Sequence, residues 1–207
     1  LHLILKTIMT TTKSKKTTTT KKKTTPTPIP ELAANPFAFE VLELVSKQRT
    51  VAKKVEVLQK YKHDSLIAIF LWNYDTSLIS ALPEGDVPYA GTDEQGSFSM
   101  TLGQKIQDAV AKMEELGTKS LGSQDQGHSS IRREYTKFYN FLKGGNDSLS
   151  NLRRETMFIN IAAGLHPLEA EIVLLCKDKK LQTKYKIDRK HIAKAYPEIK
   201  WRDGFTL

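Results

Sequence analysis

Residues 165–177 read LHPLEAEIVLLCK, and this stretch gives the plainest folding signal in the chain. Pro167 suits the first position of a helix, because its missing N–H would have no partner there. Glu169 falls in the first turn, where the helix dipole favours a negative charge. The apolar residues then recur at steps of three and four, the period of a helix that is buried on one face. They are Leu168, Ile172, Val173, Leu175 and Cys176.

Similar helical spacing continues on both sides of this stretch. Toward the C-terminus we expect a short last helix that Asp188 caps and that ends before Pro197. On the N-terminal side we expect a helix from Ser150 to about Ala163, followed by Gly164. A further helix over residues 131–142 is predicted to stop at Gly144 and Gly145, with an apolar face of Ile131, Tyr135, Phe138, Tyr139 and Leu142.

Two helices earlier in the chain have clear starting signals. Residues 102–116 follow Thr101, which stands in capping-box register with Gln104, and Gly117 closes the helix. Residues 51–58 follow Thr50, a favourable cap, and keep their apolar stripe apart from their lysines. Both segments are therefore predicted to be amphipathic surface helices.

The first helix and the third segment need more interpretation. In residues 37–45 the apolar residues keep helical spacing, with Asn35 as the expected cap and Pro36 at the first helical position. Residues 64–72 form an apolar run that is compatible with a buried helix or a buried strand. Their β-branched and aromatic residues favour a strand, whereas the neighbouring helices favour a helix, and we predict a helix.

Together these segments predict an all-α fold of about seven or eight short helices over residues 31–207. A long loop is expected at residues 82–99 and a linker at residues 118–129, because Gly, Pro and Ser interrupt the helical spacing there. Residues 1–30 are rich in Thr, Lys and Pro and are predicted to be a disordered tail. Residues 1–8 are expected not to be native, with translation starting at Met9.

Positive charge gathers at the two ends of the chain. The formal net charge is +9, and residues 1–30 hold seven lysines and no acid. Residues 177–202 hold ten basic residues against three acids, whereas residues 31–176 are mildly acidic. This asymmetry indicates contact with a polyanion, although solvated lysines also serve only to keep a protein soluble.

No catalytic or cofactor-binding signature is present in the sequence, so we predict no enzyme, no cofactor and no metal site. His166 and Glu169 stand three residues apart, but a helix start explains them better than a metal site does. The single cysteine, Cys176, lies in an apolar run, which predicts a buried thiol and a reducing compartment. No segment is long and apolar enough to predict a membrane span.

Two arginine pairs leave two interpretations open. Arg132 and Arg133 precede Glu134, and Arg153 and Arg154 precede Glu155. Local ion pairing on exposed helix faces is the commoner outcome for such residues. Alternatively, the two pairs line one face and bind phosphate groups through their forked donors.

Three blocks of sequence resemble a family of tailed-bacteriophage proteins that is best represented among myoviruses of cyanobacteria. The blocks lie within residues 74–89, 141–155 and 165–181, and the similarity continues at 185–187 and 195–199. The tail and the helices before residue 62 lie outside this similarity. The family has no assigned activity, so the resemblance implies a phage protein in the host cytoplasm, or in the virion, without implying a reaction.

For function we carry two hypotheses. The first is a phage accessory protein that binds DNA or RNA through its basic C-terminal segment. The second is a non-catalytic interaction or assembly protein that binds another phage or host protein. Neither hypothesis involves a membrane or predicts an oligomeric state.

The candidate nucleic-acid residues are expected to make two kinds of contact. Charged contacts to phosphate are expected from Lys184, Lys186, Arg189, Lys190 and Lys194, with Arg153 and Arg154 in addition. Stacking on unpaired bases is expected from Tyr185 and Trp201. The competing interpretation is that Trp201 packs on the body of the protein and the lysines face water.

Overall fold

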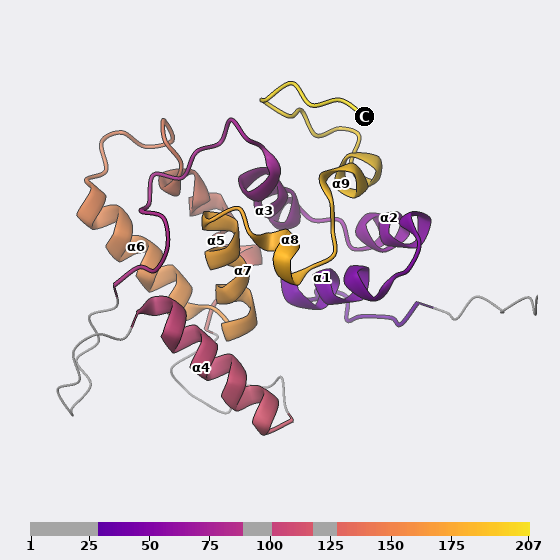
Figure 1. Ribbon diagram of the computed structural model, residues 1–207, viewed down its shortest axis with the longest axis horizontal. Helices are drawn as coiled ribbons and strands as arrows, with labels where there is room; N and C mark the ends of the chain where they lie inside the picture. Colours follow the sequence, from indigo (N-terminus) through magenta and orange to yellow (C-terminus); the bar gives the residue numbers. More distant parts are fainter. Residues whose placement is uncertain (1–28, 89–100, 118–127) are drawn as a thin grey trace, which may run out of the picture.

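A computed structural model describes residues 29–88, 101–117 and 128–207, and within these residues the fold is all-α (Figure 1). No strand occurs there; three isolated bridges join single residues. The predicted fold class is therefore confirmed. The elements are α1 (Ala38–Lys47), α2 (Val51–Lys60), α3 (Asp64–Tyr74), α4 (Leu102–Glu115), α5 (Ile131–Glu134), the 3-10 helix η1 (Tyr135–Phe141), α6 (Asn151–Gly164), α7 (Pro167–Lys177), α8 (Leu181–Lys184) and α9 (Arg189–Ala195).

Helix α7, the segment with the plainest sequence signal, lies in the middle of the fold. It packs against α1, α3, α4, α6 and α8. Figure 1 shows α4 along the lower edge of the molecule, α6 on the left, and α2 and α9 on the right. Burial covers more of α7 than the single apolar face that the sequence predicted. Its buried residues include Leu168, Ala170, Ile172, Val173 and Cys176.

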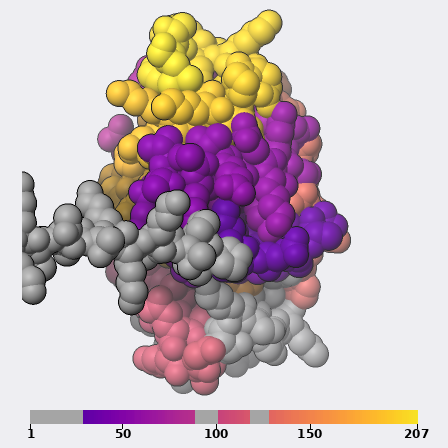
Figure 2. Space-filling view, turned by 90° about the vertical axis from the view of Figure 1, so that its right-hand side faces the viewer, coloured from indigo at the N-terminus to yellow at the C-terminus, as the bar shows by residue number. Residues whose placement is uncertain are grey.

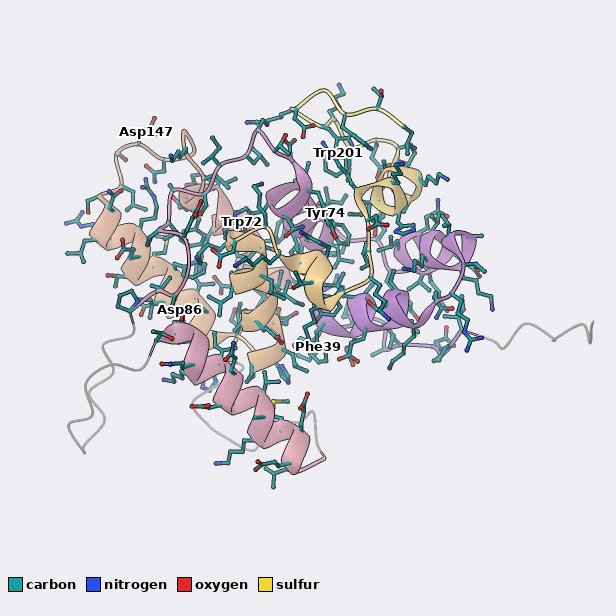
Figure 3. All side chains as sticks on the ribbon, viewed as in Figure 1. Phe39, Trp72, Tyr74, Asp86, Asp147 and Trp201 are labelled. Atoms are coloured by element: carbon teal, nitrogen blue, oxygen red, sulfur yellow. The ribbon has the colours of Figure 1, made fainter. Side chains whose placement is uncertain are left out.

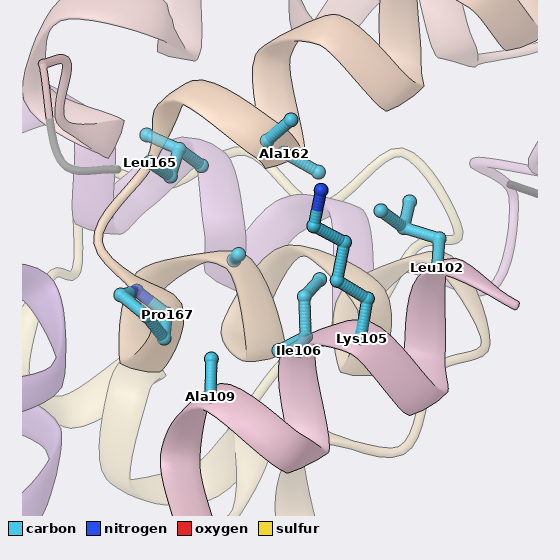
Figure 4. A pocket seen from close by; sticks show the side chains of 9 residues that line it. Leu102, Lys105, Ile106, Ala109, Ala162, Leu165 and Pro167 are labelled. Carbon is cyan, nitrogen blue, oxygen red and sulfur yellow. The ribbon is translucent and has the colours of Figure 1, made fainter. Parts of the chain in front are cut away.

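Helix α4 is attached to this centre by apolar contact. Figure 4 shows its first turns facing the end of α6 and the start of α7. Only about 10 Å³ of space remains between them, so the contact is closely packed. The apolar residues on the two sides are Leu102, Ile106 and Ala109 of α4, and Ala162, Leu165 and Pro167.

Aromatic rings fill the core between α3, η1 and α6. Trp72, labelled near the middle of Figure 3, lies 5.3 Å from Phe138 and 5.9 Å from Phe141, measured between ring centroids. Phe141 in turn meets Phe158 edge to face at 5.3 Å. Residues 64–74 are helical, which confirms the choice of a helix over a strand for this apolar segment.

The segment predicted as one α-helix over residues 131–142 is instead a single α-turn that continues as a 3-10 helix. With three residues per turn, positions i and i+3 lie directly above one another. Tyr135, Phe138 and Phe141 follow this step, which places the two buried rings of Phe138 and Phe141 on the same side of the helix. The α-helical period would have buried Tyr139, which is 53% exposed.

The predicted caps of α2 and α4 are present, but the start of α1 differs. Thr50 and Thr101 each accept a hydrogen bond from the backbone N–H three residues on. Ser150, where α6 was expected to begin, does the same. Asn35 and Pro36 were wrongly placed as the cap and first residue of α1, because the helix begins at Ala38 and Phe37 is its N-cap residue. The aromatic ring of Phe37 cannot accept the hydrogen bond that a cap supplies.

The missing cap of α1 comes from α7. One carboxylate oxygen of Glu169 accepts from the backbone N–H of Ala38 at 2.9 Å, and the other accepts from Ile131 at 2.8 Å. Glu169 is 1% exposed, so a single buried carboxylate caps both α1 and α5. Burial raises the pKa of Glu169, although its two backbone hydrogen bonds act in the opposite direction.

A buried lysine on α7 fixes the beginning of the predicted long loop. The Nζ of Lys177 donates to the carbonyls of Pro83 and Gly85 at 2.9 and 2.7 Å and also contacts Asp178. Residues 89–99 of that loop lie outside the described residues, as do residues 1–28 of the predicted tail and residues 118–127 of the predicted linker. Among the helices that the structure does describe, none has the length and apolar character needed to cross a membrane.

Candidate nucleic-acid interface

Helices α2 and α9 pack side by side and run in the same direction. Early in α2, the Nζ of Lys54 donates to the carbonyl of Lys186, just before α9. At the other end, the Tyr196 hydroxyl donates to the Leu58 carbonyl at 2.6 Å. Figure 2 shows the C-terminal segment in yellow directly above the earlier helices in purple. Segments more than 120 residues apart in the sequence therefore share this side of the molecule.

The surface formed by these two helices is rich in exposed lysines, and we call it the basic face. Lys60, Lys186, Lys190 and Lys194 define it. Among the described residues, no carboxylate lies within ion-pair distance of Lys186, Lys190 or Lys194. Lys60 pairs with Glu31 at 3.0 Å on the exposed surface. The sequence did not predict Lys60 as part of this surface, because only the packing of α2 on α9 brings the two helices together.

The basic N-terminal segment joins the body beside this face. The backbone N–H of Leu32 donates to the hydroxyl of Tyr61 at 2.8 Å, directly after α2. Together with the pair between Lys60 and Glu31, this contact places the start of the described chain at the end of α2. The seven lysines of residues 1–30 therefore come just before Glu31 and Leu32 in the sequence, and these two residues lie next to the basic face.

Arg189 and Trp201 lie together, but they contact each other rather than open solvent. The Arg189 guanidinium lies 4.2 Å from the ring centroids of both Trp201 and Phe205. It also pairs with Asp203, whose carboxylate accepts from the backbone and hydroxyl of Thr76. Trp201 is partly buried against the core, as the competing interpretation expected (Figure 3). These residues fasten the C-terminus to the body.

Tyr185 is a correction to the predicted site. It is 2% exposed, because it lies in the interior between α8 and the start of α9. A ring so enclosed cannot stack on a base, and the prediction of a stacking role for Tyr185 is wrong. Burial also raises the pKa of its hydroxyl, so Tyr185 stays neutral.

The second arginine pair separates into one buried and one exposed residue. Arg154 is 7% exposed and donates to the carbonyls of Asn140, Asn146 and Leu149 at 2.8–3.2 Å. Its expected phosphate contact is therefore wrong, since these carbonyls already occupy the guanidinium. Arg153 is exposed but lies on α6, on the opposite side of Figure 1 from α9.

Of the predicted phosphate contacts, the three lysines Lys186, Lys190 and Lys194 remain open on the basic face. Lys184 is exposed but pairs with Glu171 of α7. The described residues bring no three His, Cys, Asp or Glu side chains together as a metal site would require. His166 caps α7 by accepting from the Leu168 N–H at 3.2 Å, and Glu169 caps two other helices.

The chain belongs to the family of unknown function DUF6433, which it matches over residues 41–108 and 118–183. The match includes most of α1 and all of α2, so the expectation that the helices before residue 62 lie outside the family is wrong. It ends before α9. No curated protein and no solved structure matches the chain.

Proposed function

We propose that this protein binds the phosphate backbone of nucleic acid through the basic face and the lysines of its N-terminal segment. The observation that carries the proposal is the packing of α2 on α9. It brings Lys60 next to the helix that bears Lys190 and Lys194, beside the point where the N-terminal segment joins the body. Lysines gathered in this way neutralise phosphates and release condensed counterions.

The openness of the α9 lysines supports this role. Lys190 and Lys194 are four residues apart, so they lie on the same side of the helix. A lysine without a carboxylate neighbour loses no ion pair when a phosphate approaches. Two acids, Glu56 and Asp188, are exposed on the same two helices or their ends and limit the net charge of the surface.

The proposal includes no catalytic step. Cys176 is fully buried, and burial raises the pKa of its thiol, so it remains protonated and out of reach of a substrate. Binding by the basic face depends on charge and not on reading bases. We therefore expect little preference among sequences.

Salt-dependent binding of fluorescent DNA and RNA, duplex and single-stranded, tests this proposal. With the full chain, we expect log affinity to fall linearly with log salt between about 50 and about 300 mM. Replacing the seven lysines of residues 1–30 by Gln should make that line less steep, because fewer counterions are released. An absence of binding at the lowest salt concentration would refute the proposal.

A second candidate function is binding to another protein. It is favoured by a groove of about 610 Å³ between α6 and the segment from Ser129 to Lys137. Leu152, 75% exposed, lines this groove together with Met157 and Ile161. In this case affinity would follow one partner of the phage or host and would change little with salt. A pulldown from infected cells would separate the two candidates.

We also propose that the protein acts in tailed-bacteriophage infection, in the host cytoplasm. The support is the similarity of the three sequence blocks to phage proteins. Lys177, which holds the loop at Pro83 and Gly85, belongs to the last block, and Arg154 belongs to the second. Mass spectrometry of infected cells and of purified virions would test the setting, and absence from both would contradict it.

A further inference from the structure

A cleft of about 520 Å³ opens where the starts of α1, α3 and α5 meet. It lies beside the end of the basic face, because α2 leads through Tyr61 and Lys62 directly to His63 on the cleft wall. Its volume falls within the range of sites for small molecules and cofactors. The lining residues include Phe37, His63, His128, Arg132 and Arg133.

Two backbone amides at this junction already have an acceptor. Glu169 lines the cleft and accepts from the N–H groups of Ala38 and Ile131, the first residues of α1 and α5. A ligand would therefore meet side chains and not the amides of Ala38 and Ile131. The single acid is also outnumbered by the basic side chains around it.

Two arginines supply the positive charge of the cleft, and two histidine rings lie beside them. Arg132 reaches the carbonyl of Pro36 at 3.5 Å on one wall. Arg133 is exposed, and within the described residues no carboxylate lies within ion-pair distance of it. Burial and the nearby Arg132 lower the pKa of His63, so this ring is neutral near pH 7. Its Nδ1 accepts from the backbone N–H of Ser65 at 3.1 Å, which leaves Nε2 as a hydrogen-bond donor. His128 is exposed.

An aromatic surface completes the cleft. Phe37 is 39% exposed, although it belongs to a stack of rings. Its ring is nearly parallel to that of Phe39, with a centroid distance of 5.6 Å, and His166 lies 5.6 Å away. A large apolar ring left open at the wall of a cationic cleft offers a platform for a flat, uncharged group.

We infer that this cleft binds a phosphorylated nucleotide, with the phosphate at Arg133 and His128 and the base on Phe37. The combination of forked donors and an open ring matches these two parts of a nucleotide. The inference rests on the proposed function and deepens it, because it names a ligand for a cleft whose wall at His63 follows α2 directly in the sequence. The nucleotide is either free or the phosphorylated end of a strand.

Titration of the full-length protein with adenosine 5′-monophosphate and with adenosine tests the phosphate requirement. We expect the monophosphate to bind at least about tenfold more tightly than the nucleoside, since each tenfold step needs only one good charged contact. Arg133→Ala should remove this preference, and Phe37→Leu should weaken both compounds. Lys112→Ala, at an exposed position of α4 outside both the cleft and the basic face, should leave both affinities unchanged.

Single strands with and without a 5′-phosphate separate the two sources of the nucleotide. If the protein prefers the phosphorylated strand and Arg133→Ala abolishes that preference, the ligand is the end of a strand. If Arg133→Ala weakens the binding of the monophosphate but not of the strand, the ligand is a free nucleotide. If Arg133→Ala changes neither probe, the inference is overturned. The proposed function fails separately, if duplex binding is absent while the monophosphate still responds to Arg133→Ala.

Discussion

Lys177 on α7 and Lys194 on α9 have the same side chain and opposite surroundings. The Lys177 side chain is 1% exposed and holds two loop carbonyls, whereas Lys194 is exposed on the basic face. Arg154 and Arg153 differ in the same way within one helix turn. Charged residues in this chain therefore have two roles, one in the interior and one on the surface. Lys177 and Arg154 hold the fold together, whereas Lys186, Lys190 and Lys194 are open to a partner.

The largest loss of stability is expected for Glu169→Ala. It removes the acceptor of two buried amides and leaves α1 and α5 without a cap, so we expect the free energy of unfolding to fall by about 4 kcal/mol. Glu171→Ala, two residues away, removes a partly exposed pair with Lys184 and should cost less than about 1 kcal/mol. Urea denaturation followed by circular dichroism measures both. Equal losses would show that Glu169 does not act as a double cap.

Arg154→Ala should have the next largest effect. The substitution leaves the carbonyls of Asn140, Asn146 and Leu149 without their donor, and a loss of about 3 kcal/mol is expected. Arg153→Ala provides the control in the neighbouring position and should change stability by less than about 0.5 kcal/mol. Urea denaturation of both variants tests this prediction. A stability of Arg154→Ala close to that of the unchanged protein would contradict a structural role for Arg154.

Gly145→Ala sharpens the account of the loop that Arg154 holds. A Cβ at Gly145 would lie 1.9 Å from the backbone oxygen of Tyr139, so the loop must move. We expect a loss of about 2 kcal/mol. Gly164→Ala, at the end of α6, meets nothing within 4 Å and should be neutral or slightly stabilising. Melting temperatures of the two variants test this difference.

Asp203 gives the smallest expected stability effect and a dependence on pH. The Arg189 guanidinium and the donors of Thr76 hold the pKa of this carboxyl well below its usual value of 3.8. Its contribution to stability is therefore present above about pH 4 and is lost as the pH falls further, when the carboxylate becomes protonated. Asp203→Asn should flatten the acid side of the stability profile. An unchanged profile would show that the pair contributes nothing.

Local sequence patterns predicted the helices that local interactions define. Apolar spacing located α7 and α4, and Thr50, Thr101 and Ser150 marked three helix starts correctly. The start of α1 was misplaced because its cap, Glu169, comes from 131 residues further along the chain. The 3-10 helix was missed because Tyr135, Phe138 and Phe141 follow a period of three and not 3.6.

The candidate interface was predictable only in part. A cluster of basic residues near the C-terminus was visible, but the sequence could not distinguish Arg154 from Arg153 or Tyr185 from its exposed neighbours. Their burial depends on loops that pack from elsewhere in the chain. Lys60 joined the site only through the packing of α2 against α9.

The most direct test of the account replaces Lys186, Lys190 and Lys194 together by Ala and measures nucleic-acid affinity over a range of salt. A control variant removes the same charge from exposed positions elsewhere, at Lys112, Lys137 and Lys143. We predict that the first variant lowers the slope of log affinity against log salt by about 2–3 and leaves stability nearly unchanged, whereas the control keeps most of the slope. Equal slopes for the two variants would contradict a nucleic-acid interface on α2 and α9.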